Sequence, residues 1–200
     1  MKRNEKFVNQ YATKKVDTKA IKQLVKDPEN FEYYKYILTE EFVREYADVV
    51  DWYQVAYYSN NLTEDFVIEH KKHFKKDVMW ALQQNYGQFS DKFVKTFAKK
   101  LDWTRLNYGT LTEKFIEENL DKVDWEQLAR TATVSKSFMN RYSKNFKYGT
   151  YMLYHRETLS KADTLELWNK CWYEHDRFAA YFRHCGIKEI EKDCKYFCGE

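Results

Sequence analysis

The six residues Leu111-Thr112-Glu113-Lys114-Phe115-Ile116 belong to a pattern that recurs along this 200-residue chain. The pattern reads apolar, hydroxyl, polar, polar, Phe, aliphatic, and four further copies occupy residues 38–43, 62–67, 89–94 and 134–139. A weaker copy begins at Phe7. A pattern that returns about every 20–50 residues is typical of repeat proteins. Each copy therefore marks one structural unit.

The apolar residues that follow each Phe predict a short helix. In the copy at Phe93 they are Val94, Phe97 and Leu101, which share one face of a helix with about 3.6 residues per turn. The Thr or Ser three residues before each Phe is a good N-cap, because its hydroxyl accepts a hydrogen bond from a backbone amide of the first turn. Each unit is thus expected to begin with a helix that starts at this hydroxyl.

A second helix in each unit is predicted from Asp-Trp at residues 51–52, 102–103 and 124–125. Asp is a preferred N-cap, so the Trp would lie in the first turn of this helix. Asn-Tyr-Gly at residues 85–87 and 107–109 is expected to end it, with the Gly as a left-handed cap.

These helix pairs predict an all-α fold class. One Pro and five Gly are too few for a β-protein with many tight turns or for a Pro/Gly-rich disordered chain. Two short helices cannot bury their apolar faces alone, so we expect an α-solenoid of about six short two-helix repeats over residues 1–158. Residues 159–200 would form a C-terminal helical cap, with an apolar stripe from Leu165 to Cys185. The expected repeats lie near residues 4–37, 38–61, 62–88, 89–110, 111–133 and 134–158.

The repeated motif, Leu-Ser/Thr-Glu-x-Phe followed by Val/Leu-Asp-Trp, resembles a family of short helical repeats in proteins of bacteriophages and large DNA viruses. The resemblance covers about residues 4–158. It implies a phage or other viral origin and an interaction role, and this family has no common catalytic site to carry over. A concrete form of this expectation is an inhibitor that occludes a host protein or a bacterial defence complex, such as a CRISPR complex.

Composition narrows the function classes further. A net charge of +3 is too small to indicate nucleic-acid binding by itself, and no apolar window is long enough to cross a bilayer. All four Cys lie in the last thirty residues, which is not the distribution of a disulfide scaffold and favours the reducing cytoplasm. The chain shows no Gly-rich phosphate loop, nucleophile elbow or paired-His zinc motif. We therefore expect a cytoplasmic protein that is not an enzyme, with no cofactor, membrane or small-molecule substrate.

Tyrosines exceed what the Phe and Trp core needs, and they form one candidate binding surface. Tyrosine is enriched at protein interfaces because it offers a large contact area at a low cost in rotamer entropy. A structural role, with the ring at the edge of the core and the hydroxyl in water, is an equal alternative. The candidate residues are Tyr53, Tyr57, Tyr58, Tyr86 and Tyr108.

Charge alternates in sign from unit to unit, with net values of −4 for residues 38–61, +3 for 89–110, −3 for 111–133 and +4 for 134–158. The preferred interpretation is that neighbouring units carry complementary charges. The alternative is a basic stripe that follows the phosphates of a nucleic acid or a ribonucleoprotein. That stripe would contain Lys92, Lys95, Lys99, Lys100, Arg105, Arg141, Lys144 and Lys147.

Two groups of His and Cys residues are candidate metal ligands because of their spacing. Cys171 with His175 and Cys194 with Cys198 are i, i+4 pairs that could form a tetrahedral zinc site, although core cysteines are the preferred interpretation. His70 occupies a core position of its unit and is expected to be buried, whereas His73 is expected to be solvated.

Overall fold

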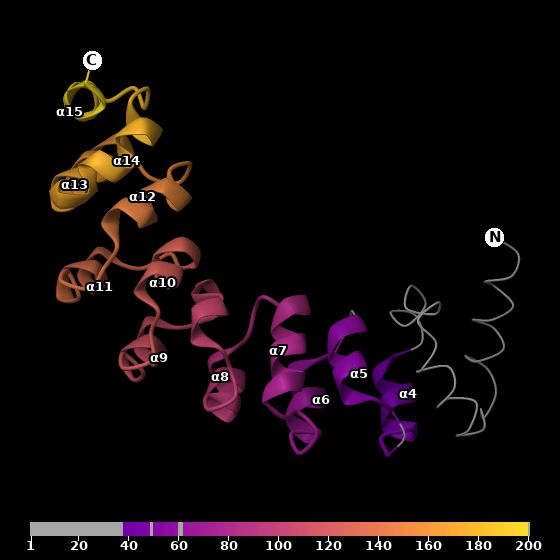
Figure 1. Ribbon diagram of the computed structural model, residues 1–200. Coiled ribbons are helices and arrows are strands. Elements are labelled where there is room, and N and C mark those ends of the chain that lie inside the picture. Colours follow the sequence, from indigo (N-terminus) through magenta and orange to yellow (C-terminus); the bar gives the residue numbers. More distant parts are fainter. Residues whose placement is uncertain (1–37, 49, 60–61, 200) are drawn as a thin grey trace, which may run out of the picture. The chain divides into compact units, whose positions relative to one another are not determined.

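Figure 1 shows the computed structural model of the protein, which describes residues 38–48, 50–59 and 62–199. Over these residues the chain forms twelve α-helices and three 3-10 helices and contains no β-strand, which confirms the predicted all-α class. The predicted repeat at residues 4–37 lies outside the described residues.

The chain divides into two compact units, Met1–Asp102 and Trp103–Glu200. The described helices of the first unit are α4 (Glu40–Glu45), α5 (Trp52–Tyr58), α6 (Glu64–Glu69), α7 (Lys76–Asn85) and α8 (Asp91–Phe97). Those of the second unit are η2 (Trp103–Arg105), η3 (Tyr108–Thr110), α9 (Glu113–Glu117), α10 (Trp125–Thr131), α11 (Lys136–Arg141), α12 (Tyr148–His155), α13 (Lys161–Lys170), η4 (Trp172–Glu174), α14 (His175–Phe182) and α15 (Lys188–Cys198). The division falls inside the predicted repeat at residues 89–110, and the predicted cap at 159–200 lies in the same compact unit as residues 111–158.

The predicted N-caps of the first helix in each repeat are confirmed. A Thr or Ser hydroxyl accepts a hydrogen bond from the amide of the anchor Phe at 3.1–3.3 Å in all five described repeats. This bond satisfies an amide that has no partner within the helix and sets the first residue of α4, α6, α8, α9 and α11. The capping residues are Thr39, Thr63, Ser90, Thr112 and Ser135.

The second helix of each repeat follows the prediction only in part. Asp51 and Asp124 cap α5 and α10 through the amides of Gln54 and Gln127, as expected. The prediction of an α-helix after Asp102 is wrong, because the chain makes only a single 3-10 turn there, Trp103–Arg105. Helices α7 and α12 form in the two repeats that lack Asp-Trp, and neither has a side-chain N-cap.

The predicted left-handed glycine caps at Gly87 and Gly109 are also wrong. Positive φ occurs only at Gly186 and Gly199 among the described glycines. Gly109 is needed for close approach instead, since a Cβ there would lie 2.5 Å from the backbone oxygen of Thr131.

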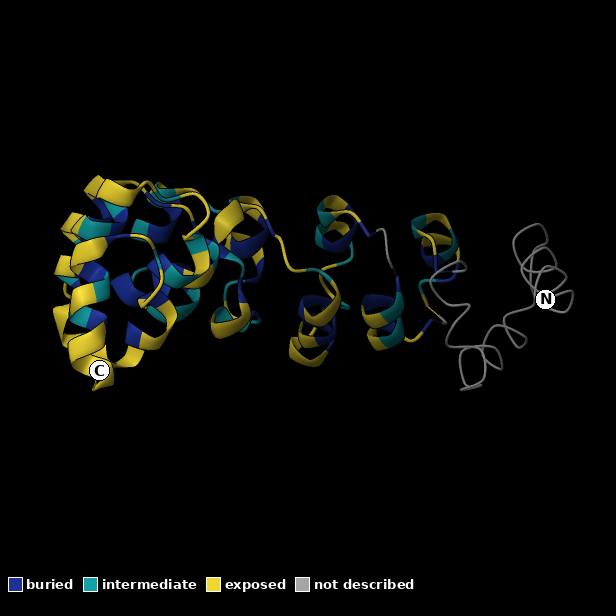
Figure 2. Ribbon diagram, turned by 90° about the horizontal axis from the view of Figure 1, so that it is seen from above, coloured by how far each residue is buried: buried dark blue, intermediate teal, exposed yellow. Residues whose placement is uncertain are grey.

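Aromatic rings from neighbouring repeats meet in the core of the first unit. The ring of Trp52 on α5 lies 6.3 Å from that of Phe66 and 5.5 Å from that of Phe74. His70 packs on Phe66 at 4.5 Å, as its position in the repeat predicts. The expectation that His73 is solvated is wrong, because its ring stacks on Trp52 at 4.3 Å and burial lowers its pKa. Figure 2 shows the result, with a buried and an exposed side on most helices.

A glutamate clamp links consecutive repeats within each unit. The first residue of one repeat's opening helix accepts hydrogen bonds from the backbone amide and hydroxyl of the N-cap residue in the next repeat. Glu40 binds the amide and hydroxyl of Thr63, both at 2.6 Å. Burial raises the pKa of the Glu40 carboxyl, but the hydrogen bonds from Thr63 and the charge of Arg44 outweigh it, so the pKa is lowered. The clamps pair Glu40 with Thr63, Glu64 with Ser90, and Glu113 with Ser135.

The C-terminal stripe does not continue as one helix. The chain breaks at Cys171 into the 3-10 turn η4 before α14 begins. The predicted stripe from Leu165 to Cys185 includes Trp172, and this placement of Trp172 is wrong. The break turns its side chain outward and leaves it 70% exposed. Helix α14 packs closely on α12, where a Cβ at Gly149 would lie 2.3 Å from the ring of Phe178.

Candidate interaction surface

Three of the five predicted tyrosines lie together on the outer side of α5. Tyr53 and Tyr57 are one helical turn apart, and their rings stack 6.2 Å apart with planes only 6° from parallel. Tyr58 meets Tyr57 edge to face at 4.9 Å. Tyr53 and Tyr57 are 39% and 41% exposed, and these three residues form what we call the α5 tyrosine cluster.

The sequence of α5 explains why the cluster faces outward. Trp52, Val55 and Ala56 are buried on the other side of the helix and hold it against the core. Because Tyr53 and Tyr57 are four residues apart, both project from the side that this buried stripe leaves open. Burial raises the pKa of the Tyr58 hydroxyl, and the neighbouring tyrosines raise it further, so this hydroxyl stays protonated at neutral pH.

A second helix in the same chain shows that the repeat does not require these rings. Helix α10 matches α5 position by position: Asp-Trp-x-Gln, then an aliphatic residue and Ala. Where α5 has Tyr53 and Tyr57, α10 has Glu126 and Arg130, which form an ordinary i, i+4 ion pair at 3.3 Å. The α5 tyrosine cluster therefore differs from α10, where Glu126 is half-buried and also accepts a hydrogen bond from the Thr150 hydroxyl at 2.9 Å.

The other two predicted tyrosines are structural, which corrects their assignment to a binding surface. Tyr86 is partly buried, and its hydroxyl donates to the carbonyl of Ser59 at 2.6 Å and accepts from the amide of Leu62 at 2.8 Å. Tyr108 is fully buried. Its hydroxyl donates to the carbonyl of Trp103 and accepts from the amide of Asp124, each at 3.0 Å. Both hydroxyls bind backbone groups of adjacent repeats, and the Tyr108 ring is not accessible to a partner.

The predicted basic stripe is divided between the two units, and several of its cations have internal partners. In the first unit Lys92 pairs with Asp65 at 2.8 Å, and Lys100 donates to the carbonyl of Phe74 at 2.6 Å. In the second unit Arg141 pairs with Glu117. Lys100 and Lys147 are half-buried, and the exposed members of the stripe are Lys92, Lys95, Lys99, Arg105, Arg141 and Lys144.

These ion pairs support the interpretation that neighbouring repeats carry complementary charges. Asp65 and Lys92 lie on the opening helices of consecutive repeats, and so do Glu117 and Arg141. In the last such step Lys136 stands where earlier repeats have an acidic residue, and it binds Asp163 at 2.5 Å and Glu166 at 3.1 Å on α13.

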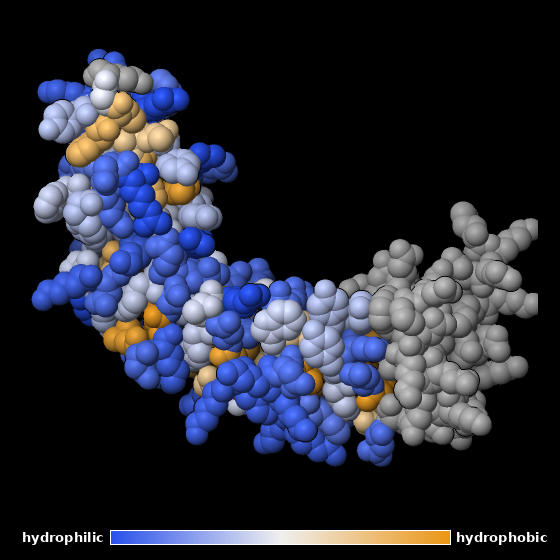
Figure 3. All heavy atoms as spheres, viewed as in Figure 1, coloured by the Kyte–Doolittle hydropathy of each residue, from blue (hydrophilic) through white to orange (hydrophobic). Residues whose placement is uncertain are grey.

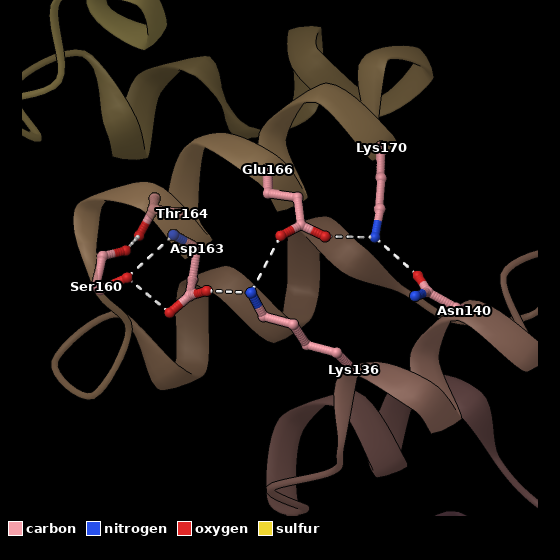
Figure 4. A network of polar contacts seen from close by, with 7 residues as sticks. All are labelled: Lys136, Asn140, Ser160, Asp163, Thr164, Glu166 and Lys170. Carbon is pink, nitrogen blue, oxygen red and sulfur yellow. Dashed lines mark hydrogen bonds and ion pairs between the residues drawn. The ribbon is translucent and has the colours of Figure 1, made fainter.

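Figure 4 shows that the contacts of Lys136 with Asp163 and Glu166 take the place of the glutamate clamp. The hydroxyl of Ser160 caps α13 through the amide of Asp163, as a serine does in earlier repeats. Hydrogen bonds from Lys136 and Ser160 lower the pKa of the Asp163 carboxyl. Lys170 closes the network by binding Glu166 and Asn140, both at 2.8 Å. The network has a partner for every charge it contains, so it joins helices and offers no binding site.

The zinc alternative is not supported by the geometry. No three His, Cys, Asp or Glu side chains converge as metal ligands anywhere in the described ranges. His175 is buried with its ring stacked on Trp168 at 4.0 Å, and its Nε2 is 2.8 Å from the Trp168 carbonyl oxygen. Cys171 and Cys194 are buried free thiols, and burial raises the pKa of Cys171 to about 12, whereas Cys198 is exposed. These residues do not assemble around one point.

A set of exposed aromatic side chains in the second unit was not predicted from the sequence. The predicted stripe includes Trp172, and the break after Cys171 turns that ring outward. Figure 3 shows hydrophobic atoms reaching the surface near the C-terminal helices, between hydrophilic ones. The exposed aromatics there are Tyr154, Trp172, Tyr173, Tyr181, Tyr196 and Phe197.

Comparison with known proteins gives no assignment: no protein-family model matches the chain, and neither does any curated protein or solved structure. Of the helices described, none combines the length and apolar character that a membrane span requires.

Proposed function

We propose that this protein is a protein-binding repeat module and that the α5 tyrosine cluster is a principal part of its binding surface. The observation that carries the proposal is the comparison of α5 with α10. The same helix is built twice, and only α5 places two stacked, exposed rings where the other copy has an ion pair. Rigid, exposed aromatic rings are the anchors that protein interfaces favour.

The architecture we propose is an α-solenoid of about six two-helix repeats with a C-terminal helical cap. The glutamate clamp supports it, because the same bond joins consecutive repeats in both compact units. Such a chain presents a long surface built from successive helices, which suits recognition of another macromolecule.

The resemblance to viral helical repeats makes the proposal more specific. We infer a phage-encoded inhibitor in the host cytoplasm, which occludes a host protein or a defence complex rather than acting as an enzyme. Occlusion needs only shape and anchors, and the α5 tyrosine cluster supplies such anchors.

Capture experiments with a transplanted ion pair test the proposal. The full chain and a Tyr53→Glu/Tyr57→Arg variant are used as baits in bacterial lysate, and bound proteins are identified by mass spectrometry. The variant carries the residues that α10 uses at these positions, so the helix should keep its fold while losing both rings. Tyr196→Ala, which removes an 81% exposed ring in the second unit, is the control.

We expect a specific partner that the full chain and Tyr196→Ala both bind. The transplanted variant should bind this partner about tenfold more weakly, since an anchor ring contributes roughly 1–2 kcal/mol to binding. A partner bound equally by all three proteins would contradict the assignment of the surface. Salt-dependent binding to DNA or RNA, lost when Lys95, Lys99 and Arg105 become Ala, would favour the basic stripe instead.

A further inference from the structure

A pocket of about 410 Å³ opens in the second unit between the end of α12, the start of α13 and the loop after α14. Its volume falls within the range of small-molecule sites, which is about 300–1,000 Å³. Among the acidic and basic side chains in its wall, Arg156, Lys161 and His184 are basic and Glu157 is acidic. The wall therefore favours an anion.

The basic side chains keep donors available for a ligand. Arg156 and His184 are exposed and make no hydrogen bond or ion pair with any described residue. Lys161 donates to the carbonyl of Gly186 at 3.3 Å, which occupies only one of the three N–H donors on its ammonium group. A guanidinium and an ammonium directed at one pocket can together hold a phosphate group.

The rest of the wall is apolar and aromatic. Phe182 and Ile187 are buried and line the pocket from below the surface, while Tyr181 is 62% exposed and leaves much of its ring free. Stacking on such a ring stabilises a planar group regardless of its identity. The pocket thus offers cations for one end of a ligand and an aromatic face for the other.

We propose that this pocket binds a phosphate ester that carries a planar ring, as a nucleotide or an aryl phosphate does. The site is separate from the α5 tyrosine cluster, and its test needs no protein partner. The expectation that the chain has no small-molecule substrate still stands as a prediction, because no reaction is assigned to this ligand.

Calorimetric titration of the full chain tests the proposal with four probes: AMP, phenyl phosphate, adenosine and inorganic phosphate. We expect AMP or phenyl phosphate to bind with a Kd below about 1 mM, and the tighter of the two identifies the source of the ring. Adenosine and inorganic phosphate should bind at least about tenfold more weakly, because each fills one half of the site.

Two variants and their matched controls locate the binding. Arg156→Ala should weaken the binding of AMP or phenyl phosphate by about tenfold or more. Lys192 is an exposed cation on α15 outside the pocket, and Lys192→Ala should leave this binding unchanged. Tyr181→Leu should weaken AMP by about fivefold or more and leave inorganic phosphate unchanged, with Tyr173→Leu as its control. No saturable binding of AMP or phenyl phosphate up to about 10 mM would overturn the proposal. So would equal losses in the pocket variants and their controls.

Discussion

Glu64 provides the sharpest test of how consecutive repeats are joined. Its carboxylate accepts hydrogen bonds from the backbone amide of Ser90 at 2.6 Å and from the Ser90 hydroxyl. Hydrogen bonds to charged groups contribute about 1.5–3 kcal/mol when shielded, and less where water competes. For this partly exposed pair of bonds we expect Glu64→Ala to lower the free energy of unfolding by about 1–2 kcal/mol.

The neighbouring residue is a matched control. Asp65 also lies in the first turn of α6, and its 84% exposed side chain makes an ion pair with Lys92. An exposed pair contributes about 0.2–1 kcal/mol, so Asp65→Ala should cost less than Glu64→Ala. Both substitutions remove one negative charge from the same helix N-terminus, so the difference between them excludes the helix-dipole contribution.

Urea unfolding followed by circular dichroism measures the three proteins. A double-mutant cycle with Ser90→Ala isolates the hydroxyl bond, with an expected coupling of about 0.5–1.5 kcal/mol, because Ser90→Ala keeps the backbone amide that Glu64 also binds. If Glu64→Ala were no more destabilising than Asp65→Ala, the glutamate clamp would not be what joins the repeats.

Three further substitutions test packing, protonation and the buried tyrosine. Gly149→Ala should lower the free energy of unfolding by about 1–3 kcal/mol, because its Cβ would meet a buried ring at 2.3 Å, while Gly87→Ala, with nothing within 4 Å, should be near neutral in the same urea titration. Burial lowers the pKa of His155 below 6.5, so as the pH falls the unfolded state takes up the proton first. The free energy of unfolding should therefore decrease as the pH falls through 6.5 towards the lowered pKa. Urea titrations at several pH values should show a weaker dependence of this free energy on pH for His155→Gln. Tyr108→Phe removes a buried hydroxyl with two backbone partners and should cost about 1–3 kcal/mol, whereas Tyr57→Phe on the surface should change the urea midpoint little.

The sequence predicts best what is decided within a few residues. The caps at Thr63 and Ser135 form because a hydroxyl and the amide three residues later meet whenever a helix starts there. The glutamate clamp escaped prediction because its two partners lie 22–26 residues apart. The break at Cys171 also escaped, since no Gly or Pro marks it and the apolar spacing runs through it without interruption.

The same distinction separates the candidate tyrosines. Tyr53 and Tyr57 share a helix, so their i, i+4 spacing alone places them on one side. Tyr86 and Tyr108 are held by backbone groups of adjacent repeats, and no local pattern reveals that their hydroxyls have partners. Sequence reasoning could therefore identify a tyrosine excess but could not divide it into surface and structural members.

Folding stability alone does not explain why α5 carries exposed tyrosines. An offset aromatic pair contributes about 0.5–1.5 kcal/mol and an exposed i, i+4 ion pair about 0.3–0.5 kcal/mol, so folding alone gives only a small reason to prefer rings at Tyr53 and Tyr57. The ion pair of Glu126 and Arg130 occupies the same positions of a helix with the same cap and the same buried side. Stability leaves the choice nearly open, and exposed rings carry a cost in hydration that an ion pair does not. We therefore propose that these rings contact a partner, which would remove their apolar faces from water.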